Sequence, residues 1–239
     1  MAKIRLFIDH PLAEGQPVQL QASQAHYLSG VMRLRAGEVI SVFNGRQGEW
    51  SARLGDIGKR GGVLHPVEQT APQRNPPDLW LIFAPIKKAR TDFIVEKATE
   101  LGAARILPAQ TDFTNSERIR QDRLQAHAVE ATEQCGGTYV PQVEALVPLA
   151  RLLDDWDGDR NILWCDEALA GPAQTLAGLP GGSWAILIGP EGGFSDAERK
   201  RLVDLPFVHR ISLGPRILRA DTAAVASISL WQAALGDWA

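Results

Sequence analysis

The sequence predicts an α/β protein of two domains, in which a small β-barrel precedes a larger domain built on a mostly parallel sheet. Residues 1 to about 70 contain short β-type runs and little helical periodicity. From residue 79 onward, apolar β-type runs alternate with helical stretches, which is the order expected of βαβ units. Residues 69–77 separate the two patterns and are polar and rich in proline, so they are not expected to continue a sheet. We therefore expect domains at residues 1–72 and 73–239.

The first domain contains two β-type runs, Val39–Phe43 and Trp50–Leu54. Asn44-Gly45 follows the first run and predicts a hairpin turn, because both residues tolerate a positive φ angle. A single short stretch, His26–Arg33, has helical periodicity. Together these features predict a small antiparallel barrel.

In the second domain, β-type and helical patterns alternate along the chain. Ser195, with Glu198 three residues later, predicts the start of one helix through a capping box. The last helical stretch is apolar around most of its circumference and should be buried, either within one subunit or in a dimer seam. We expect strands at Leu79–Ala84, Ile106–Leu107, Ile162–Cys165, Trp184–Ile188 and Val208–Leu213, and further helices at about Asp92–Leu101, Glu117–Gln134 and Thr222–Leu235.

Composition limits the classes of protein that fit this chain. It has 239 residues, of which 45% are hydrophobic, so it can bury a substantial core. It shows no secretory leader and no apolar run of about twenty residues, and we expect a cytoplasmic protein that does not span a membrane. Cys135 and Cys165 lack the spacing of a metal site, so we expect buried free thiols and no bound metal.

The charge is unevenly distributed. A net charge of −3 argues against a protein that coats nucleic acid nonspecifically. Residues 1–74 nevertheless carry a net +3 and the remainder −6. The difference fits an N-terminal module that contacts RNA and a C-terminal module that performs chemistry, although an excess of this size is also common on ordinary protein surfaces.

Two segments in the last third of the chain point to a ligand site. Each is an apolar β-type run that stops at a Gly/Pro turn and enters a helix: Leu-Ile-Gly-Pro-Glu-Gly-Gly-Phe-Ser at residues 187–195, and Leu-Gly-Pro-Arg-Ile-Leu-Arg-Ala-Asp-Thr-Ala-Ala at 213–224. This layout is typical of a ligand crevice at the carboxyl ends of parallel strands, although one such loop alone would be an ordinary strand-to-helix turn. The chain has no GxxxxGK[ST] or GxGxxG motif, which counts against kinases and dinucleotide-binding enzymes.

The two segments closely resemble the cofactor-binding motifs of the RsmE family of rRNA uridine-N3 methyltransferases, in the SPOUT superfamily. Residues 26–38, residues 87–90 with 96–102, and residues 130–134 with Val140-Pro141 are similar to further signatures of that family, in the same order. The resemblance implies a PUA-like β-barrel domain and a SPOUT-type α/β methyltransferase domain with a C-terminal deep trefoil knot. It also implies a homodimer that binds S-adenosylmethionine (SAM) and methylates N3 of a uridine in 16S rRNA of the assembled small ribosomal subunit.

The resemblance also assigns roles to residues of the two loops. Arg219 is a candidate for stabilising negative charge on the uracil, and Asp221 for accepting the N3 proton or fixing Arg219. The family more often has Glu at position 221, and a helix N-cap is an equally good interpretation of Asp221. The expected cofactor-binding residues are Leu187, Ile188, Gly189, Glu191, Gly192, Leu213, Gly214, Ile217, Leu218, Arg219 and Thr222.

Clustered cations are the candidates for contact with RNA, against the alternative of solvated surface charge. They are Arg5, Arg33, Arg35, Lys87, Lys88 and Arg90.

Two other functions remain open from the sequence. Another SPOUT RNA methyltransferase, acting on tRNA or on a ribose 2′-oxygen, would share the cofactor loops but not residues 26–38. A noncatalytic RNA-binding ribosome assembly factor would carry a vestigial pocket and bind RNA regardless of SAM.

Overall fold

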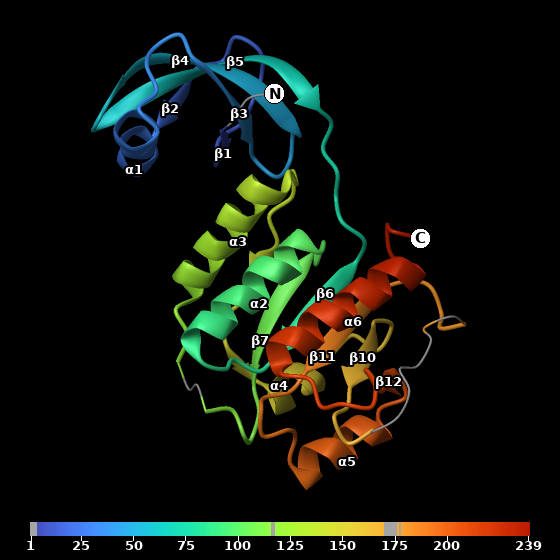
Figure 1. Cartoon of the computed structure of the whole chain (residues 1–239). Helices are drawn as coiled ribbons and strands as arrows, with labels where there is room; N and C mark the ends of the chain where they lie inside the picture. Colours follow the sequence, from blue (N-terminus) through green and yellow to red (C-terminus); the bar gives the residue numbers. More distant parts are fainter. Residues whose placement is uncertain (1–3, 116–117, 170–175, 177) are drawn as a thin grey trace. The chain divides into compact units, whose positions relative to one another are not determined.

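The computed structural model describes residues 4–115, 118–169, 176 and 178–239 (Figure 1). The chain divides into two compact units. The first consists of residues 1–75 together with 132–139, and the second of residues 76–131 together with 140–239.

The first unit is built on a five-stranded sheet in the order β1-β3-β4-β5-β2. Its strands are β1 (Arg5–Phe7), β2 (Val18–Leu20), β3 (Val39–Phe43), β4 (Glu49–Gly58) and β5 (Gly61–Ala71). Leu6, Leu28 and Leu54 are among the side chains of its core, which also receives α1 (Ala22–His26) and a π-helical turn at Tyr27–Val31. The sheet is not wholly antiparallel as expected, because β1 pairs with β3 in parallel.

The turn between β3 and β4 differs from the expected two-residue type. Gly45 has a φ of +78°, but Asn44 does not adopt a positive φ. Asn44 acts through its side chain instead, since its Oδ1 accepts hydrogen bonds from the N–H groups of Arg46 (3.0 Å) and Gln47 (2.9 Å). The result is a longer loop, closed by a side chain that mimics a turn of the backbone.

The proline-rich segment begins later than its composition predicts. Gln69 pairs with Trp50, and Ala71 pairs with Glu49, so β5 extends to Ala71. The expectation that residues 69–71 leave the sheet was wrong, because polar side chains are tolerated on a strand that exposes them to solvent. The sheet ends where Pro72 removes a donor.

The second unit contains a parallel sheet in the order β12-β10-β11-β6-β7-β8, with β9 also paired to β7, and this confirms the predicted βαβ layout. The strands are β6 (Leu79–Phe83), β7 (Arg105–Gln110), β8 (Gln142–Val143), β9 (Val147–Pro148), β10 (Asn161–Cys165), β11 (Trp184–Ile188) and β12 (Val208–Ile211). The helices are α2 (Lys88–Glu100), α3 (Gln121–Cys135), α4 (Leu149–Asp154), α5 (Asp196–Asp204) and α6 (Ala220–Leu235). Residue 117, where α3 was expected to begin, lies outside the described residues.

The uninterrupted apolar run of β11 reflects burial on both faces of this sheet. Trp184, Ile186 and Ile188 join the core shared with α2 and α6, whereas Ala185 and Leu187 join the core shared with α4 and α5. Successive side chains of a strand point to opposite faces, so a strand covered on both faces must be apolar throughout. Such a strand fixes the position of the loop that follows it.

Helix α6 packs against α2 and the sheet (Figure 1). Ala224, Ile228 and Trp231 are buried, and Gln232 Nε2 donates to the carbonyl oxygen of Leu101 (2.7 Å). Burial is not complete around the helix as its composition suggested, because the Leu230 side chain is exposed. No helix among the described residues is long and apolar enough to cross a membrane.

Candidate functional site

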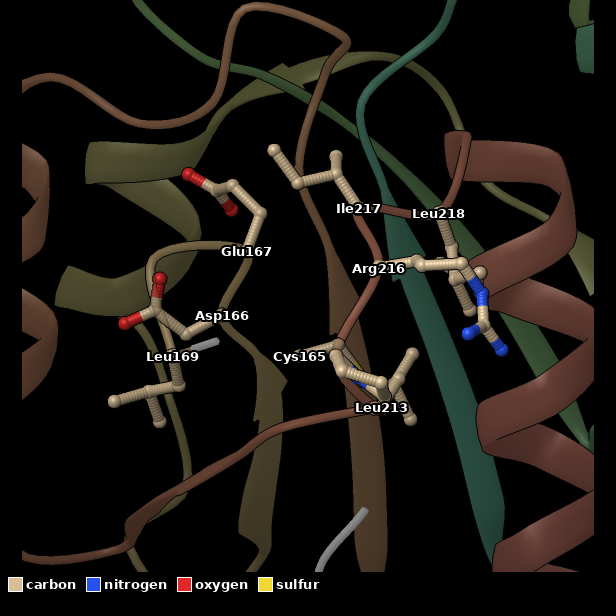
Figure 2. Close-up of a pocket in the computed structure, with 11 residues that line it drawn as sticks. Cys165, Asp166, Glu167, Leu169, Leu213, Arg216, Ile217 and Leu218 are labelled. Atoms are coloured by element: carbon tan, nitrogen blue, oxygen red, sulfur yellow. The ribbon is translucent and has the colours of Figure 1, made fainter. Parts of the chain in front are cut away.

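The second unit is hollowed at the carboxyl ends of β10, β11 and β12. Two adjoining cavities of ≈ 430 and ≈ 680 Å³, counted with the space open to solvent, have several wall residues in common and form one continuous site. Figure 2 shows the smaller cavity, with the segment after β10 facing the segment after β12. The residues that line both cavities are Cys165, Glu167, Ile217, Leu218 and Ala223.

The loop after β11 requires glycine for two different reasons. A Cβ atom at Gly189 would lie 2.6 Å from Cε2 of Phe194, a buried ring. Gly193 has a φ of +72°, and its N–H donates to the carbonyl oxygen of Pro190 (2.9 Å). Without side chains at these positions the main chain turns tightly and borders the larger cavity.

Helix α5 begins directly after this loop, with the predicted capping box. Ser195 Oγ accepts from the N–H of Glu198 (3.3 Å), and the Glu198 carboxylate accepts from the N–H of Ser195 (2.9 Å). This reciprocal pair satisfies two backbone donors and fixes the point where the chain leaves the cavity.

A buried ion network holds the segment after β10. The Asp166 side chain has no exposed surface, and it accepts hydrogen bonds from Arg199 Nη1 (2.8 Å), Arg210 Nε (3.0 Å) and the N–H of Ala168 (3.0 Å). Burial alone would favour the neutral carboxyl group, but these three donors outweigh it and hold the pKa of Asp166 below its ordinary value. Arg199 also pairs with Glu167. The network therefore ties the cavity wall to α5 and β12.

The segment after β12 contributes an apolar side chain that solvent largely surrounds. Ile217 is 82% exposed, although it lines both cavities. Gly214 has a φ of +123°, and a Cβ atom at this position would meet nothing within 4 Å, so the cavity is open beside it. An exposed large apolar residue at the edge of a cavity is suited to covering a ligand.

The start of α6 brings together two residues that the sequence assigned to different roles. Arg90 Nη1 donates to Asp221 Oδ2 (2.8 Å), while Asp221 Oδ1 accepts from the N–H of Thr222 (2.9 Å). The N-cap of α6 is Arg219, whose side chain is exposed, and not Asp221 as one interpretation suggested. Asp221 therefore lies in the first helical turn with both carboxylate oxygens engaged.

The structure gathers most of the expected cofactor-binding residues around the cavities. Of the predicted set, Leu187, Gly192 and Thr222 are absent from their walls. Leu187 points into the core below the loop, and Gly192 lies against Phe113. The predicted residues that line the cavities are Ile188, Gly189, Glu191, Leu213, Gly214, Ile217, Leu218 and Arg219.

One wall was missed by the sequence reasoning. Cys165, Asp166, Glu167 and Leu169 line the smaller cavity. A signal was present, because these residues follow the expected strand Ile162–Cys165 at its carboxyl end, where ligands bind in parallel sheets. The segment lacks the Gly/Pro turn that marked the other two loops.

The candidate RNA-binding cations are in different environments. The Arg5 side chain is 15% exposed, and its guanidinium donates to Glu49 (2.7 Å) and to the carbonyl oxygens of Thr132 (2.7 Å) and Gly137 (2.6 Å). This set of partners gives Arg5 a structural role in the first unit, and a contact with RNA would have to compete with these hydrogen bonds.

The remaining candidates are closer to the surface. Arg33 and Arg35 are exposed, and Arg33 adopts a φ of +57°. Lys87 and Lys88 line a hollow that also includes Glu191, whereas Arg90 is paired with Asp221. Lys87, Lys88 and Arg90 therefore all lie beside the loops that follow β11 and β12.

The two cysteines also differ. Cys165 is buried, and burial raises the pKa of its thiol to about 12, partly offset by a hydrogen bond with Ser227. Cys135 is exposed, which contradicts the expectation of two buried thiols. It is the last residue of α3, and its neighbour Gln134 is exposed as well.

The chain was compared with known proteins. Residues 73–232 match the RNA methyltransferase domain family, and residues 20–66 match the RNA methyltransferase PUA domain. Ribosomal RNA small subunit methyltransferase E of Rickettsia conorii is 31% identical over 94% of this chain and 93% of its own. The protein of the same name from Bacillus subtilis is 28% identical over 94% of both chains.

A solved structure agrees with these matches. Ribosomal RNA small subunit methyltransferase E from Neisseria gonorrhoeae, crystallised with S-adenosyl methionine, superposes with a TM-score of 0.89, at 28% identity over 99% of both chains. The agreement covers the PUA-like unit and the parallel sheet with its three loops. The chain belongs to the ribosomal RNA small subunit methyltransferase E family of SPOUT RNA methyltransferases.

Proposed function

We propose that this protein transfers a methyl group from SAM to N3 of a uridine in 16S rRNA, acting on the assembled small ribosomal subunit in the cytoplasm. The observation that carries the proposal is the continuous cavity at the carboxyl ends of β10, β11 and β12, in a chain of this family. The solved relative from Neisseria gonorrhoeae is bound to S-adenosyl methionine.

The residues around the cavity fit SAM. Its volume is that of a small-molecule site, and Leu213, Leu218 and Ala223 offer apolar surface for a flat base and for the carbon chain next to the sulfonium. At Gly214 the missing side chain leaves open space in the wall, so a ligand can approach the main chain. The Glu167 carboxylate lines both cavities and suits a cationic group of SAM.

The chemistry sets a clear demand on the protein. SAM, when bound, supplies a methyl group activated by a sulfonium. The acceptor nitrogen, N3 of uracil, belongs to a weakly acidic imide and carries a proton at neutral pH. The chain must therefore hold this nitrogen in line with the methyl group, stabilise the uracil anion and provide an acceptor for its proton.

Arg219 is suited to stabilising the uracil anion. Its side chain is exposed at the edge of the larger cavity, and it has no ion-pair partner in the described part of the chain. A guanidinium presents several N–H donors in a fixed plane, which matches the carbonyl oxygens that gain charge when N3 loses its proton.

Asp221 is better suited to positioning than to accepting the proton. One of its oxygens accepts from Arg90 and the other from the N–H of Thr222. Glu191 is a stronger candidate for the proton acceptor, because it is exposed, lines the cavity and has no hydrogen-bond partner in the described ranges. A Glu191→Gln variant should lose about 10²- to 10⁴-fold in kcat. The Asp221→Asn variant should retain the acidic limb of the pH–rate profile. If the acidic limb disappears in this variant, Asp221 and not Glu191 is the base.

The homodimer is part of the same proposal. Leu230 is exposed on α6, and a second copy of the chain would cover it. A Leu230→Glu variant should then be monomeric in light scattering at concentrations where the wild type is dimeric. A wild type that remains monomeric would remove this part of the proposal.

The function is tested by transfer of labelled methyl from SAM to unmodified small subunits, to their naked rRNA and to bulk tRNA, followed by nucleoside analysis. We expect label in subunits as 3-methyluridine. Label on ribose or in tRNA would refute the proposed acceptor. Ile217→Ala should raise the KM for SAM, whereas Val203→Ala, an exposed apolar residue of α5, serves as the matched control.

A further inference from the structure

A second hollow, separate from the SAM cavity, lies where α2 and α3 begin. It measures ≈ 660 Å³ with the space open to solvent. We call it the α2–α3 groove. Among the described residues, its wall contains the cations Lys88, Arg118, Arg120 and Arg123 and one carboxylate, Asp92, which is already paired with Arg123. These described residues carry a net positive charge in a chain whose net charge is −3.

Several of these cations are available to a ligand. Within the described part of the chain, the side chains of Lys88 and Arg118 have no ion-pair or hydrogen-bond partner. Arg120 pairs with Asp122, but both side chains are largely exposed, so water and salt screen the pair and an anion can compete for Arg120.

Backbone groups add to the positive field. Lys88 is the first residue of α2, and Arg120 directly precedes Gln121, the first residue of α3. In Figure 1 each helix begins at its lower left end. The ion pair between Asp92, the fifth residue of α2, and Arg123, the third residue of α3, joins the helices near these ends. The N-cap of α2, Lys87, makes no side-chain hydrogen bond to the helix. Helix N-termini carry unpaired N–H groups and a partial positive charge, so two of them at one groove favour a bound anion.

The groove also has an apolar side. Ile86, Ile119 and Leu124 contribute to its wall beside the cations. A site for a small inorganic ion needs no apolar surface of this kind. The combination of apolar surface with arginine and lysine fits a nucleotide chain, in which phosphates alternate with sugars and bases.

An intermediate hollow shares wall residues with the groove on one side and with the SAM cavity on the other. Ile86 and Lys88 line both the groove and an intermediate hollow of ≈ 570 Å³. Pro190 and Glu191 line that same intermediate hollow and the larger SAM cavity. A strand of RNA in the groove would therefore continue toward the place where the methyl group is transferred.

We propose that the α2–α3 groove binds the phosphate backbone of the RNA substrate next to the target nucleotide, with Arg118 and Arg120 as phosphate contacts. The inference rests on the proposed function, because it names the position of the RNA relative to the methyl donor. It adds to the predicted contacts Lys87 and Lys88 two arginines that the sequence analysis did not select. These arginines position the substrate and take no part in methyl transfer.

The test is the double variant Arg118→Glu/Arg120→Glu, with Arg151→Glu as the control. Arg151 matches Arg120 closely, because both side chains are 76% exposed and each pairs with a nearby aspartate. Binding of unmodified small subunits and of their naked rRNA is measured by filter retention over a range of salt concentrations. Affinity for SAM is measured separately and reports on folding.

The double variant should bind both RNA forms about ten-fold or more weakly, with unchanged affinity for SAM. The slope of log K against log salt concentration should fall by roughly 0.7–0.9 for each RNA phosphate that the variant no longer neutralises. Arg118→Ala/Arg120→Ala should show a smaller change of the same sign. In methylation assays, the KM for RNA should rise much more than kcat falls.

The outcomes separate this inference from the proposed function. If the wild type methylates subunits and the double variant matches Arg151→Glu in affinity and salt slope, the groove assignment is refuted and the function stands. If the wild type transfers no methyl group but the double variant loses affinity for rRNA, the groove stands and the function fails. A loss confined to intact subunits, with naked rRNA unaffected, would mean contact with ribosomal protein and would overturn the inference.

Discussion

The buried carboxylate Asp166 should be the most sensitive position in the wall of the proposed SAM cavity. We consider Asp166→Asn, which keeps the size of the side chain and removes its charge. In the wild type, Arg199 and Arg210 both donate to this carboxylate, and Arg199 also reaches Glu167 at the cavity. The substitution therefore alters stability and the cavity wall together.

The expected loss can be estimated from these hydrogen bonds. An asparagine has one acceptor oxygen, and its NH₂ group would face one of the guanidinium donors. At least two charge-assisted hydrogen bonds are weakened or removed, each contributing about 1.5–3 kcal/mol. Arg199 and Arg210 retain 23% and 37% exposure, so water can solvate part of what is removed. We expect a decrease of about 3 kcal/mol in the free energy of unfolding, the lower end of the range for breaking a buried ion pair.

Urea unfolding at several pH values provides the assay. Because the pKa of Asp166 lies below its ordinary value of 3.8, its charge stabilises the folded state above that pH. This contribution disappears as the pH falls through the folded-state pKa. The difference in free energy of unfolding between wild type and Asp166→Asn should therefore be constant near neutral pH and should shrink below about pH 4.

Asp154→Asn provides the control, because Asp154 is an exposed aspartate paired with Arg201. This substitution should lower the free energy of unfolding by less than about 1 kcal/mol. Calorimetric titration with SAM should show weaker binding for Asp166→Asn at temperatures where the variant is folded. A gap that stays the same down to pH 2, or a loss no larger than that of Asp154→Asn, would refute the idea that the buried charge holds this wall.

Three further outcomes follow from the same structure. In native protein at pH 8, a thiol reagent should label Cys135 rapidly and leave Cys165 unlabelled, because burial raises the pKa of the Cys165 thiol to about 12, with both cysteines labelled after unfolding. Ser195→Ala should lower the free energy of unfolding by about 1 kcal/mol in urea titrations, since it removes the N-cap of α5. Arg5→Ala should lower the free energy of unfolding by roughly 2–3 kcal/mol, because it leaves carbonyl oxygens unpaired. Arg46 is an exposed arginine of the same unit, so Arg46→Ala should have little effect on unfolding. Neither variant should change the affinity for RNA.

The order of elements in the second unit could be predicted because its signals are local. The run Trp184–Ile188 is apolar throughout and coincides with β11, and the capping box at Ser195 starts α5. The first unit was harder to predict. β1 and β2 are short strands whose pairing depends on distant partners, such as Arg5 opposite Ser41. Hydrophobic periodicity carries no information about such pairing.

The site could be predicted to the extent that its residues follow strands in the sequence. The loops after β11 and β12 carry Gly and Pro, which mark turns, and most of their expected residues line the cavity. The segment after β10 (residues 166–169), which forms the third wall of the cavity, contains no Gly/Pro turn. Its position results from the parallel pairing of β10 with both β11 and β12, which brings Asp166 between Arg199 and Arg210. Tertiary pairing of this kind cannot be derived from a single sequence.

The ion pair between Arg90 and Asp221 shows how this limit affects the assignment of roles. The sequence offers an arginine at the start of α2 and a carboxylate at the start of α6, and each alone suits contact with substrate. Packing of the two helices against one sheet brings them within 2.8 Å of each other. The arginine then holds one carboxylate oxygen, and the N–H of Thr222 holds the other, so both oxygens are already engaged within the protein. Glu191, which lies on a loop and has no such partner among the described residues, keeps the freedom that a base requires.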